Sequence, residues 1–410
     1  MLELSAKSSR LWQTYNVANP VNPPRGMRDF LPEDKRARDL VLSKIRSTYE
    51  ARGYQEIETP ALEDIAKLTS GQGGDNEKLA FRVMKRGAEL DEALASSGEL
   101  ADLGLRYDLT VPLTRYYATN RNSLPTVFKA IQTGPVWRAE RPQKGRYRQF
   151  VQCDIDIIGD ASGLAEIDLL TSSLAALDAL GLSDAVIRVN HRSLLVALLN
   201  TLGVAEADHG LAMISIDKLD KIGADGVAAE LEERFGVGAA FSAWISALDF
   251  SVIPSELSEI FSVVDASRLK YDPTLVRGMG YYTGPIFEIE HPGSGSSIGG
   301  GGRYDGMVGK WLGQDVPAVG ISLGFERVMD LIDPSLFAGS AESVVLVLEG
   351  DVLAKAVEIR DSLIAQGYRV RFENRPKKLN GLLESMAANG FTHFATLDES
   401  TTEIELRPIS

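Results

Sequence analysis

The chain has 410 residues, 44% of them hydrophobic, so it is long enough for two or three domains with separate cores. Its net charge of −14 argues against general coating of nucleic acid and against adhesion to anionic membranes, because both need broad positive fields. The single cysteine, Cys153, excludes an internal disulfide, and the four histidines are too scattered to favour a His/Cys metal site. We expect no membrane association and a reducing, cytoplasmic location, since the sequence has no apolar run of membrane-spanning length.

The first part of the chain predicts helices separated by one strand. After a loosely ordered lead-in over residues 1–22, Pro32 and two acidic residues begin an amphipathic helix over 32–52. A strand over 54–59 ends at a proline, and an acidic, Ala-rich helix follows near 87–98. Packing alone accounts for this order of elements, so it indicates no function.

Residues 105–112 predict a strand that turns into a helix. On that strand Asp108 and Thr110 share one face. Either residue is also a good N-cap for the helix that follows. A capping role and a ligand role therefore both stay open.

Residues 136–158 predict a hairpin with a basic loop. The loop holds five cations and one acid: Arg138, Arg141, Lys144, Arg146 and Arg148, with Glu140. The second strand then alternates, with Val151, Cys153, Ile155 and Ile157 on one face and Gln152, Asp154 and Asp156 on the other. By the same rule Arg138 and Glu140 share a face of the first strand. A solvated hairpin with salt bridges is one explanation, but a basic loop in an acidic chain favours an anion site.

Helical patterns without strand alternation fill residues 191–270 and indicate an insertion between two parts of a sheet domain. Two Gly-rich stretches, 275–284 and 296–306, follow. Their four consecutive glycines, 299–302, form either a flexible loop or a place where backbone approaches a ligand closely. The stretch is not a P-loop, because it lacks the first glycine and the Ser/Thr of that motif.

Residues 318–324 predict an apolar strand that leads into a helix with Arg327 in its first turn. An arginine at the positive end of a helix is unfavourable unless a negative charge lies nearby. A salt bridge with Glu326 or Asp330 would provide it, and so would an anionic ligand shared with the helix end.

From residue 343 onwards strands and helices alternate. The expected strands are 344–348, 368–372, 391–397 and 403–407, and the expected helices are 351–365 and 377–389. This alternation predicts a small, mainly parallel α/β domain.

Taken together, these stretches resemble the class II aminoacyl-tRNA synthetases and, within them, the histidyl-tRNA synthetases. The helix and strand that end at Pro60 resemble motif 1, residues 136–158 resemble motif 2, and residues 320–327 resemble motif 3. The sequences LVRGMGYYTG (275–284) and GGGRYDG (300–306) resemble the histidine-specific motifs of that family.

The resemblance implies an α+β fold, with a class II synthetase-like antiparallel sheet flanked by helices. Its implied segments are a catalytic core in two parts (1–190 and 271–335), a helical insertion (191–270) and a shortened anticodon-binding-like α/β domain (341–410). Motif 1 forms the dimer interface in this class, so the resemblance also implies a homodimer.

The implied function is histidine–tRNA ligation, in which L-histidine and ATP, with Mg²⁺, form histidyl-adenylate before transfer to the 3′ end of tRNA(His). Matching histidine-binding positions are Asp108, Thr110, Arg138, Gln152, Asp156, Arg277, Tyr281 and Tyr282. Matching ATP-binding positions are Arg138, Glu140, Arg146, Phe150 and Arg327. Arg138 and Arg277 are the implied catalytic residues, and no metal ligand is implied. Implied tRNA contacts are Gln143 and Lys144 in the loop, and Arg369, Arg371, Arg375, Lys377 and Lys378 in the last domain.

Three departures from the family pattern bear on these roles. Gly280 stands where the family commonly has Asp, the insertion is shorter than usual, and the last domain lacks the usual final helix. Two other functions share the resemblance: the non-catalytic regulatory subunit of ATP phosphoribosyltransferase, and a histidine-adenylating enzyme that does not act on tRNA. The chain retains these catalytic and binding positions of the family together, which favours the ligase: Arg138, Gln152, Asp156, Arg277 and Arg327.

Overall fold

The computed structural model describes residues 21–69, 79–143, 145–277, 280–333, 336 and 342–409. The predicted lead-in over 1–22 therefore lies almost entirely outside the described residues. Within those ranges no helix is both long and apolar enough to span a membrane.

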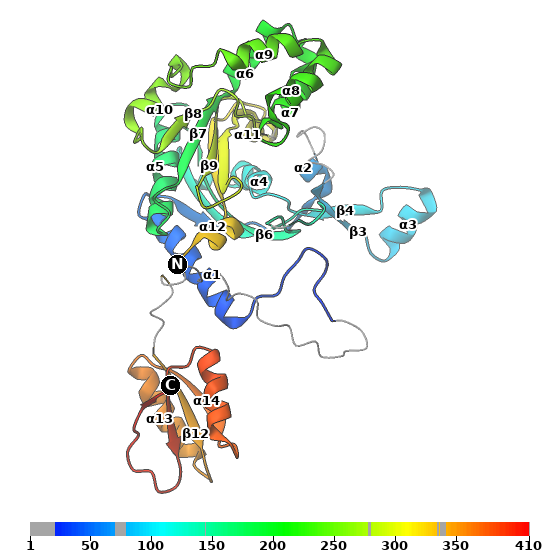
Figure 1. Cartoon of the computed structure of the whole chain (residues 1–410). Coiled ribbons are helices and arrows are strands. Elements are labelled where there is room, and N and C mark those ends of the chain that lie inside the picture. The colour runs from blue at the N-terminus through cyan, green and yellow to red at the C-terminus, as the bar shows by residue number, and fades with distance from the viewer. Residues whose placement is uncertain are drawn as a thin grey trace.

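A large mixed sheet organises the first 330 residues (Figure 1), with the strand order β1-β5-β6-β11-β10-β9-β7-β8. Its strands are β1 Gln55–Ile57, β5 Phe128–Trp137, β6 Gln149–Ile158, β7 Val186–His191, β8 Leu269–Tyr271, β9 Pro285–Glu290, β10 Gly299–Arg303 and β11 Ala318–Gly324. The central strands pair antiparallel, while β1 and β8 join the two edges in parallel. The predicted α+β fold with a mainly antiparallel sheet is confirmed.

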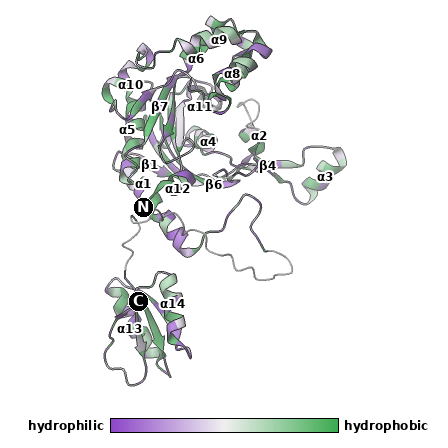
Figure 2. Cartoon of the chain, in the orientation of Figure 1, coloured by the Kyte–Doolittle hydropathy of each residue, from purple (hydrophilic) through white to green (hydrophobic). Residues whose placement is uncertain are grey.

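One face of this sheet carries an apolar core. The helices that supply it are α1 Pro32–Glu50, α5 Leu164–Ala179, α10 Ser258–Val263 and α12 Phe325–Leu331. Hydrophobic colour runs along α5 in Figure 2, and its leucines, such as Leu169, pack on strand residues such as Ile155. Cys153 and Ile157 lie in the same core, so the predicted apolar face of β6 is confirmed.

The opposite face meets a second core. Around it lie α4 Thr110–Asn120, α11 Asp305–Leu312, α6 Arg192–Leu202, α7 His209–Ile216, α8 Leu219–Phe235 and α9 Gly238–Ser246. The stretch between β7 and β8 is fully described, and its regular elements are helical. A small antiparallel sheet extends to one side, with β2 Leu62–Asp64, β3 Phe81–Met84 and β4 Ala101–Leu105, beside α2 Ile65–Thr69 and α3 Ala88–Ser96.

Three expectations for the first 330 residues need correction. The strand expected over 105–112 ends at Leu105, because Asp108 accepts a hydrogen bond from the backbone N–H of Val111 and thereby starts α4. The first hairpin strand ends at Trp137, so Arg138 and Glu140 lie in the loop after it.

The third correction concerns the consecutive glycines. They form strand β10, paired with β9 and β11, and not a flexible loop. Glycine is required because a side chain at Gly301 would overlap the carbonyl oxygen of Gly320 on the neighbouring strand.

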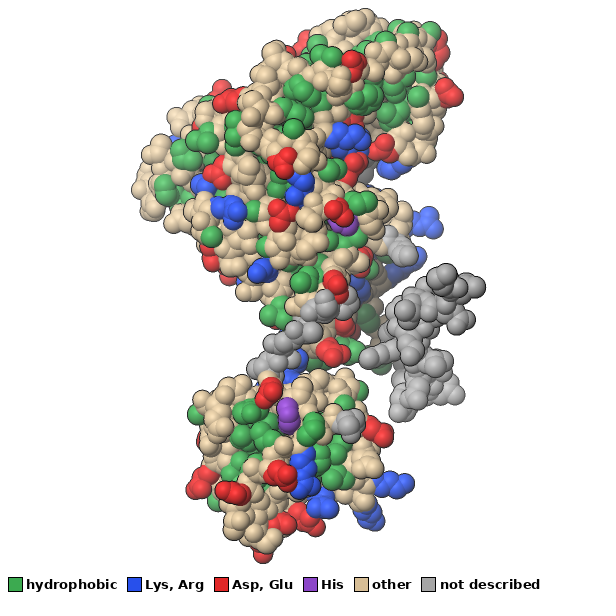
Figure 3. All heavy atoms as spheres, turned by 60° about the vertical axis from the view of Figure 1, so that its left-hand side comes forward, with side chains coloured by type: hydrophobic (Ala, Val, Ile, Leu, Met, Phe, Trp, Pro, Cys, Tyr) green, Lys and Arg blue, Asp and Glu red, His purple; other side chains and the backbone are tan. Residues whose placement is uncertain are grey.

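The C-terminal unit is a four-stranded sheet of order β13-β12-β14-β15. Its elements are β12 Ser343–Leu348, α13 Leu353–Ala365, β13 Arg369–Asn374, α14 Leu379–Ala388, β14 His393–Leu397 and β15 Arg407–Pro408. The first three strands of that order are parallel, as predicted. The strand expected over 403–407 is wrong, since only Arg407–Pro408 pairs, antiparallel to β14. Cations and acids mingle on the surface of this unit in Figure 3.

Candidate active site

Two adjoining cavities lie on the polar side of β6. The inner cavity, about 140 Å³, is lined by Asp108, Thr110, Arg138, Gln152, Asp154, Asp156, Arg277, Tyr281, Tyr282, Gly300, Gly301, Tyr304, Gly320, Ile321 and Ser322. The outer cavity, about 320 Å³, is lined by Arg138, Glu140, Gly145, Arg146, Tyr147, Phe150, Gln152, Arg277, Glu288, Ser297, Ile298, Gly299, Gly300, Ser322, Gly324, Glu326 and Arg327. Shared residues such as Arg138, Gln152 and Arg277 stand where the two cavities meet.

The structure brings the predicted residues together. All eight predicted histidine-binding residues line the inner cavity, and all five predicted ATP-binding residues line the outer one. These residues come from β6, the turn before α4, the loop after β5, the stretch before β9 and the start of α12. Gly280, one of the departures from the family pattern, is exposed and does not line the inner cavity.

The inner cavity holds hydrogen-bond acceptors that lack partners. Within the described chain, Asp108 Oδ2, Gln152 Oε1 and Asp154 Oδ1 are buried with no hydrogen-bond donor. One oxygen of Asp108 accepts the bond from Val111 and the other has no donor, and the residue also lines the inner cavity, so capping does not exclude a ligand contact. Buried acceptors without donors are costly, and together they indicate a ligand rich in N–H groups.

Burial also changes the ionisation of the three carboxyl groups. It raises the pKa of Asp108 to about 6 and that of Asp156 to about 7, and the charge of Asp108 adds to the effect on Asp156. Burial, followed by the nearby charge of Asp156, raises the pKa of Asp154 well above its ordinary value. A cationic ligand would stabilise the ionised forms of all three, because it supplies the missing opposite charge.

Tyrosines close the deep end of the inner cavity. The hydroxyl of Tyr304 donates a 2.5 Å hydrogen bond to Asp156 Oδ1. The ring centroid of Tyr281 lies 4.7 Å from that of Tyr282 and 6.1 Å from that of Tyr304. The aromatic walls and the acid between them suit a flat, polar ring.

Glycines of the central sheet, Gly300, Gly301 and Gly320, also line the inner cavity. A Cβ on Gly302 would lie 2.8 Å from the ring of Tyr282, and one on Gly320 would overlap Asp156 Oδ1. Glycine at these strand positions lets polar side chains lie directly against the backbone.

The outer cavity is lined by four arginines and three glutamates, a small excess of positive charge. Arg138, Arg146, Arg277 and Arg327 line it, and burial together with the charge of Arg146 lowers the pKa of Arg327. The guanidinium of Arg138 lies 5.0 Å from the ring centroid of Phe150. Arginines held this close to one another favour a polyanion, which relieves their mutual repulsion.

Glu326 does not compensate for Arg327, contrary to one sequence-based expectation. Its carboxylate accepts hydrogen bonds from Arg38 at 2.7 and 2.8 Å and is also paired with Arg28. Arg327 instead donates to the backbone carbonyl of Ser297. The cationic character of the outer cavity is therefore not cancelled by Glu326.

Residues from the start of the chain hold the loop after β5. The guanidinium of Arg28 lies 3.5 Å from the ring centroid of Tyr147 and is also paired with Glu326. The carbonyl of Gly26 accepts a 2.8 Å hydrogen bond from the N–H of Arg148. At the loop tip Gln143 is exposed and exchanges backbone hydrogen bonds with Arg146, whereas Lys144 lies outside the described residues.

Sequence reasoning missed several lining residues. Asp154 was on the predicted polar face of β6, and its alternation with Gln152 and Asp156 was the signal that could have identified it. Tyr304 lies in the GGGRYDG stretch, but its bond to Asp156 depends on the pairing of distant strands. No sequence signal pointed to Ser322 or to the pairing of Arg28 with Glu326.

No cluster of three or more potential metal ligands occurs in the part of the chain that the structure describes. Three carboxylates line the outer cavity, Glu140, Glu288 and Glu326. Glu326 is held by Arg28 and Arg38, and Glu140 lies 3.2 Å from Arg146. A metal that uses few protein ligands and several oxygens of a bound phosphate is compatible with this set.

Comparisons with known proteins identify the family that the chain resembles. The family described as histidyl-tRNA synthetase matches residues 26–328. A histidine–tRNA ligase of Leifsonia xyli subsp. xyli is 52% identical, with 96% of this chain and 100% of the relative covered. A solved histidyl-tRNA synthetase from Nostoc sp. PCC 7120 has a TM-score of 0.76 at 27% identity, with 95% of both chains covered. An ATP phosphoribosyltransferase regulatory subunit/histidyl-tRNA synthetase structure from Bacillus halodurans, at 20% identity and a TM-score of 0.74, covers 93% of this chain and 99% of its own and shares the fold.

Proposed function

The chain belongs to the histidyl-tRNA synthetase family, and we propose that it activates L-histidine with ATP and transfers the product to the 3′ end of tRNA(His). Membership makes it an aminoacyl-tRNA ligase, and neither the regulatory-subunit reading nor the tRNA-independent reading is favoured. One observation carries the detailed proposal: an acidic inner cavity with unpaired acceptors opens into a cationic outer cavity.

We propose that histidine occupies the inner cavity. Asp108, Thr110 and Gln152 would bind the α-ammonium end, and Asp156, Tyr281 and Tyr282 would recognise the imidazole. The unpaired oxygens of Asp108, Gln152 and Asp154 support this placement, because histidine carries N–H donors at both ends. A site of this kind rejects amino acids that leave its acceptors unpaired.

ATP would then occupy the outer cavity. Arg146 and Arg327 would hold the β- and γ-phosphates, and Glu140 and Phe150 would contact the adenine. Arg138 and Arg277 line both cavities, so we assign them to the α-phosphate and the histidine carboxylate. In the reaction a carboxylate oxygen attacks the α-phosphorus, the bond to the bridging oxygen breaks, and pyrophosphate leaves. The arginines contribute by holding both oxygens in line and by stabilising the charge that develops.

We propose that Mg²⁺ accompanies ATP and supplies further charge neutralisation on the phosphates. The carboxylates that line the outer cavity are already paired, Glu140 with Arg146, Glu288 with Arg188 and Arg277, and Glu326 with Arg28 and Arg38, so the metal would use few of them. Phosphate oxygens and water would provide the remaining ligands.

The second step needs the 3′ end of tRNA beside the adenylate. We propose that the loop tip, with Gln143 and Lys144, meets the acceptor end. The segments 1–190 and 271–335 would form the class II catalytic core, 191–270 the insertion, and 341–410 the anticodon-binding-like domain. A cytoplasmic homodimer formed through motif 1 completes the proposal.

Histidine-dependent pyrophosphate exchange, followed by charging of tRNA(His), tests this function. Exchange together with charging is the expected result. Absence of exchange would exclude both enzymatic readings, and exchange without charging would leave only an adenylating enzyme that does not use tRNA.

A further inference from the structure

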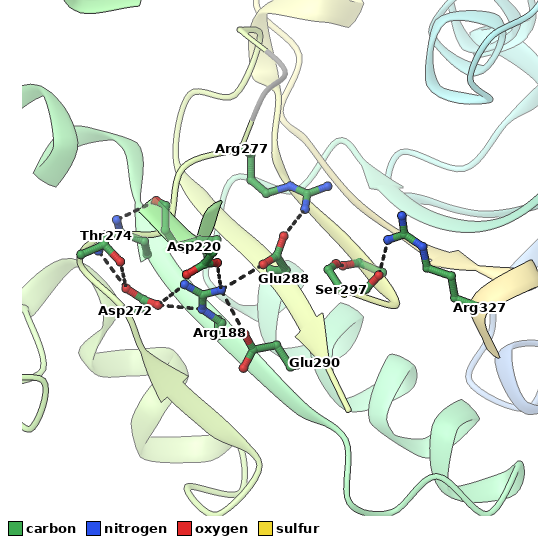
Figure 4. A network of polar contacts seen from close by, with 12 residues as sticks. Arg188, Asp220, Asp272, Thr274, Arg277, Glu288, Glu290, Ser297 and Arg327 are labelled. Atoms are coloured by element: carbon green, nitrogen blue, oxygen red, sulfur yellow. Dashed lines mark hydrogen bonds and ion pairs between the residues drawn. The ribbon is translucent and has the colours of Figure 1, made fainter. Parts of the chain in front are cut away.

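A buried arginine behind the two cavities joins several carboxylates into one network (Figure 4). Arg188 lies on β7 and is 7% exposed. Its Nη1 lies 3.1 Å from Glu288, 3.0 Å from Glu290 and 3.3 Å from Asp220 of α8. Its Nε donates a 2.6 Å hydrogen bond to Asp272. One cation therefore faces four carboxylates, and each of them depends on it for part of its charge compensation.

Only one of these contacts leads directly to the proposed catalytic machinery. Glu288 Oε1 accepts from Arg188, and Glu288 Oε2 accepts a 2.8 Å hydrogen bond from Arg277. Arg188 and Glu288 are direct cross-strand partners on β7 and β9, so the sheet itself fixes their relative position. Glu290 uses the same Nη1 of Arg188 but has no described contact with Arg277.

The guanidinium of Arg277 is otherwise held by contact with the strand beside it. A Cβ on Gly300 would lie only 2.8 Å from Arg277 Cζ, so the group rests directly on the backbone of β10. Arg277 Nε is buried and has no partner within the described chain. The bond to Glu288 is the side-chain hydrogen bond described for this guanidinium.

We propose that Arg188 is a positioning residue for Arg277 and acts through Glu288. Arg188 holds one carboxylate oxygen of Glu288, so the carboxylate presents only its other oxygen to Arg277. Without Arg188, both oxygens would turn to Arg277 and pair with it side by side, the geometry that arginine and carboxylate prefer. The guanidinium would then be drawn away from the histidine carboxylate.

The inference rests on the proposed function, because it assumes that Arg277 binds the carboxylate of histidine. Its test is the dissociation constant of histidine, measured by titration calorimetry on the full chain without ATP or Mg²⁺. Because the titration contains no Mg²⁺, a contact between Glu288 and the metal cannot affect the measured dissociation constant. A wild-type protein that binds no histidine would overturn the proposed function itself.

Arg188→Met is expected to weaken histidine binding by about tenfold or more, and Glu290→Gln by less than about twofold. Glu290→Gln is the matched control, since it removes the negative charge from a contact of similar length to the same Arg188 atom. In a Glu288→Gln background, Arg188→Met should add less than about twofold, because the charge that Arg188 controls is already gone. Equal losses for Arg188→Met and Glu290→Gln, or an unchanged effect of Arg188→Met in that background, would overturn the inference.

If Arg188→Met folds poorly, Arg188→Lys takes its place in the double-mutant comparison with Glu288→Gln. Lysine keeps the buried positive charge but loses the fork that serves several carboxylates at once. We expect a rise in the dissociation constant of about threefold, again absent in the Glu288→Gln background. A rise that persists there would mean that Arg188 acts on the general fold and not through Glu288.

Discussion

The inner cavity and the C-terminal unit both carry charged residues, but they differ in whether those residues have hydrogen-bond or ion-pair partners. In the inner cavity, Asp154 and Asp156 are 4% and 3% exposed, and unpaired acceptors surround them. In the C-terminal unit, Arg371 is exposed and bonded to Glu373, and Arg375 lies 2.8 Å from Glu349. The first region is incomplete without a ligand, whereas these two arginines of the second region are already compensated.

This difference shows where the structure is informative about function. A buried acceptor without a donor carries a large free-energy penalty, so its ligand can be described chemically. An exposed ion pair contributes little free energy, and the same residues serve equally well as a solvated surface or as phosphate contacts. We therefore expect substitutions in the inner cavity to have large and specific effects, and those in the C-terminal unit to have small effects that depend on salt.

Arg277→Ala is expected to cause the largest loss. Histidine-dependent pyrophosphate exchange should fall by about 1000-fold, because a partly buried cation that stabilises developing charge is removed. Arg360→Ala, at a partly exposed arginine of the C-terminal unit, is the control and should leave exchange unchanged. Wild-type exchange in Arg277→Ala would show that this arginine has been assigned wrongly.

Gly320→Ala tests the close approach of backbone and acid. The new methyl group would overlap Asp156 Oδ1, so the KM for histidine should rise by about 100-fold or more. Gly381→Ala in α14 is matched to it, since a Cβ there meets nothing within 4 Å. Similar kinetics for the two variants would contradict the described geometry of the cavity.

Asp156→Asn should raise the dissociation constant of histidine by about 10- to 100-fold at pH 8, because an ionised acceptor of N–H groups is lost. Wild-type affinity should fall as the pH drops through about 7, the pKa to which burial raises Asp156, and should fall further near 6 as Asp108 is protonated. Calorimetric titrations from pH 5 to 8 measure both effects. Histidine titrates in the same range, so the flatter profile of the variant is the decisive comparison.

The same substitution is expected to stabilise the ligand-free protein at high pH. A carboxyl whose pKa is raised in the folded state binds protons more tightly there than in the unfolded chain. Its contribution to the free energy of unfolding is therefore lost as the pH rises from about 4 through about 7. Asp156→Asn should be about 1–3 kcal/mol more stable than wild type at pH 8 and nearly equal at pH 4, as measured by urea unfolding. A variant that is less stable at pH 8 would contradict the cost of burying this acid.

The C-terminal cations should show the smallest effect. Replacing Lys377 and Lys378 by alanine is expected to raise the KM for tRNA by about threefold and to reduce its dependence on salt, because each lost phosphate contact releases fewer counterions. Pyrophosphate exchange should be unchanged, since it needs no tRNA. A fall in exchange would show that this unit also supports the catalytic core.

Much of the site was predictable because β6 alternates strictly. The alternation alone places Gln152, Asp154 and Asp156 on one face of a strand, and the family resemblance adds the residues that meet them. The family resemblance implied the main α+β architecture, which is confirmed.

Other features could not be predicted because they depend on contacts between distant strands. The bond from Tyr304 to Asp156 joins residues 148 positions apart, and the pair of Arg38 with Glu326 joins residues 288 apart. Local signals were also misleading at Asp108, where a single side-chain bond to the backbone ends the extended stretch and starts a helix. Four consecutive glycines suggested a loop, yet close packing between strands requires them in β10.

The central claim is that the inner cavity is built for histidine. Titration of the full chain with L-histidine and with L-phenylalanine, in the absence of ATP, tests it most directly. We predict one histidine bound per chain and a preference over phenylalanine on the order of 10⁴-fold, because phenylalanine leaves the ring-facing acceptors unpaired. Equal affinity for the two amino acids, or no binding of histidine, would contradict the account.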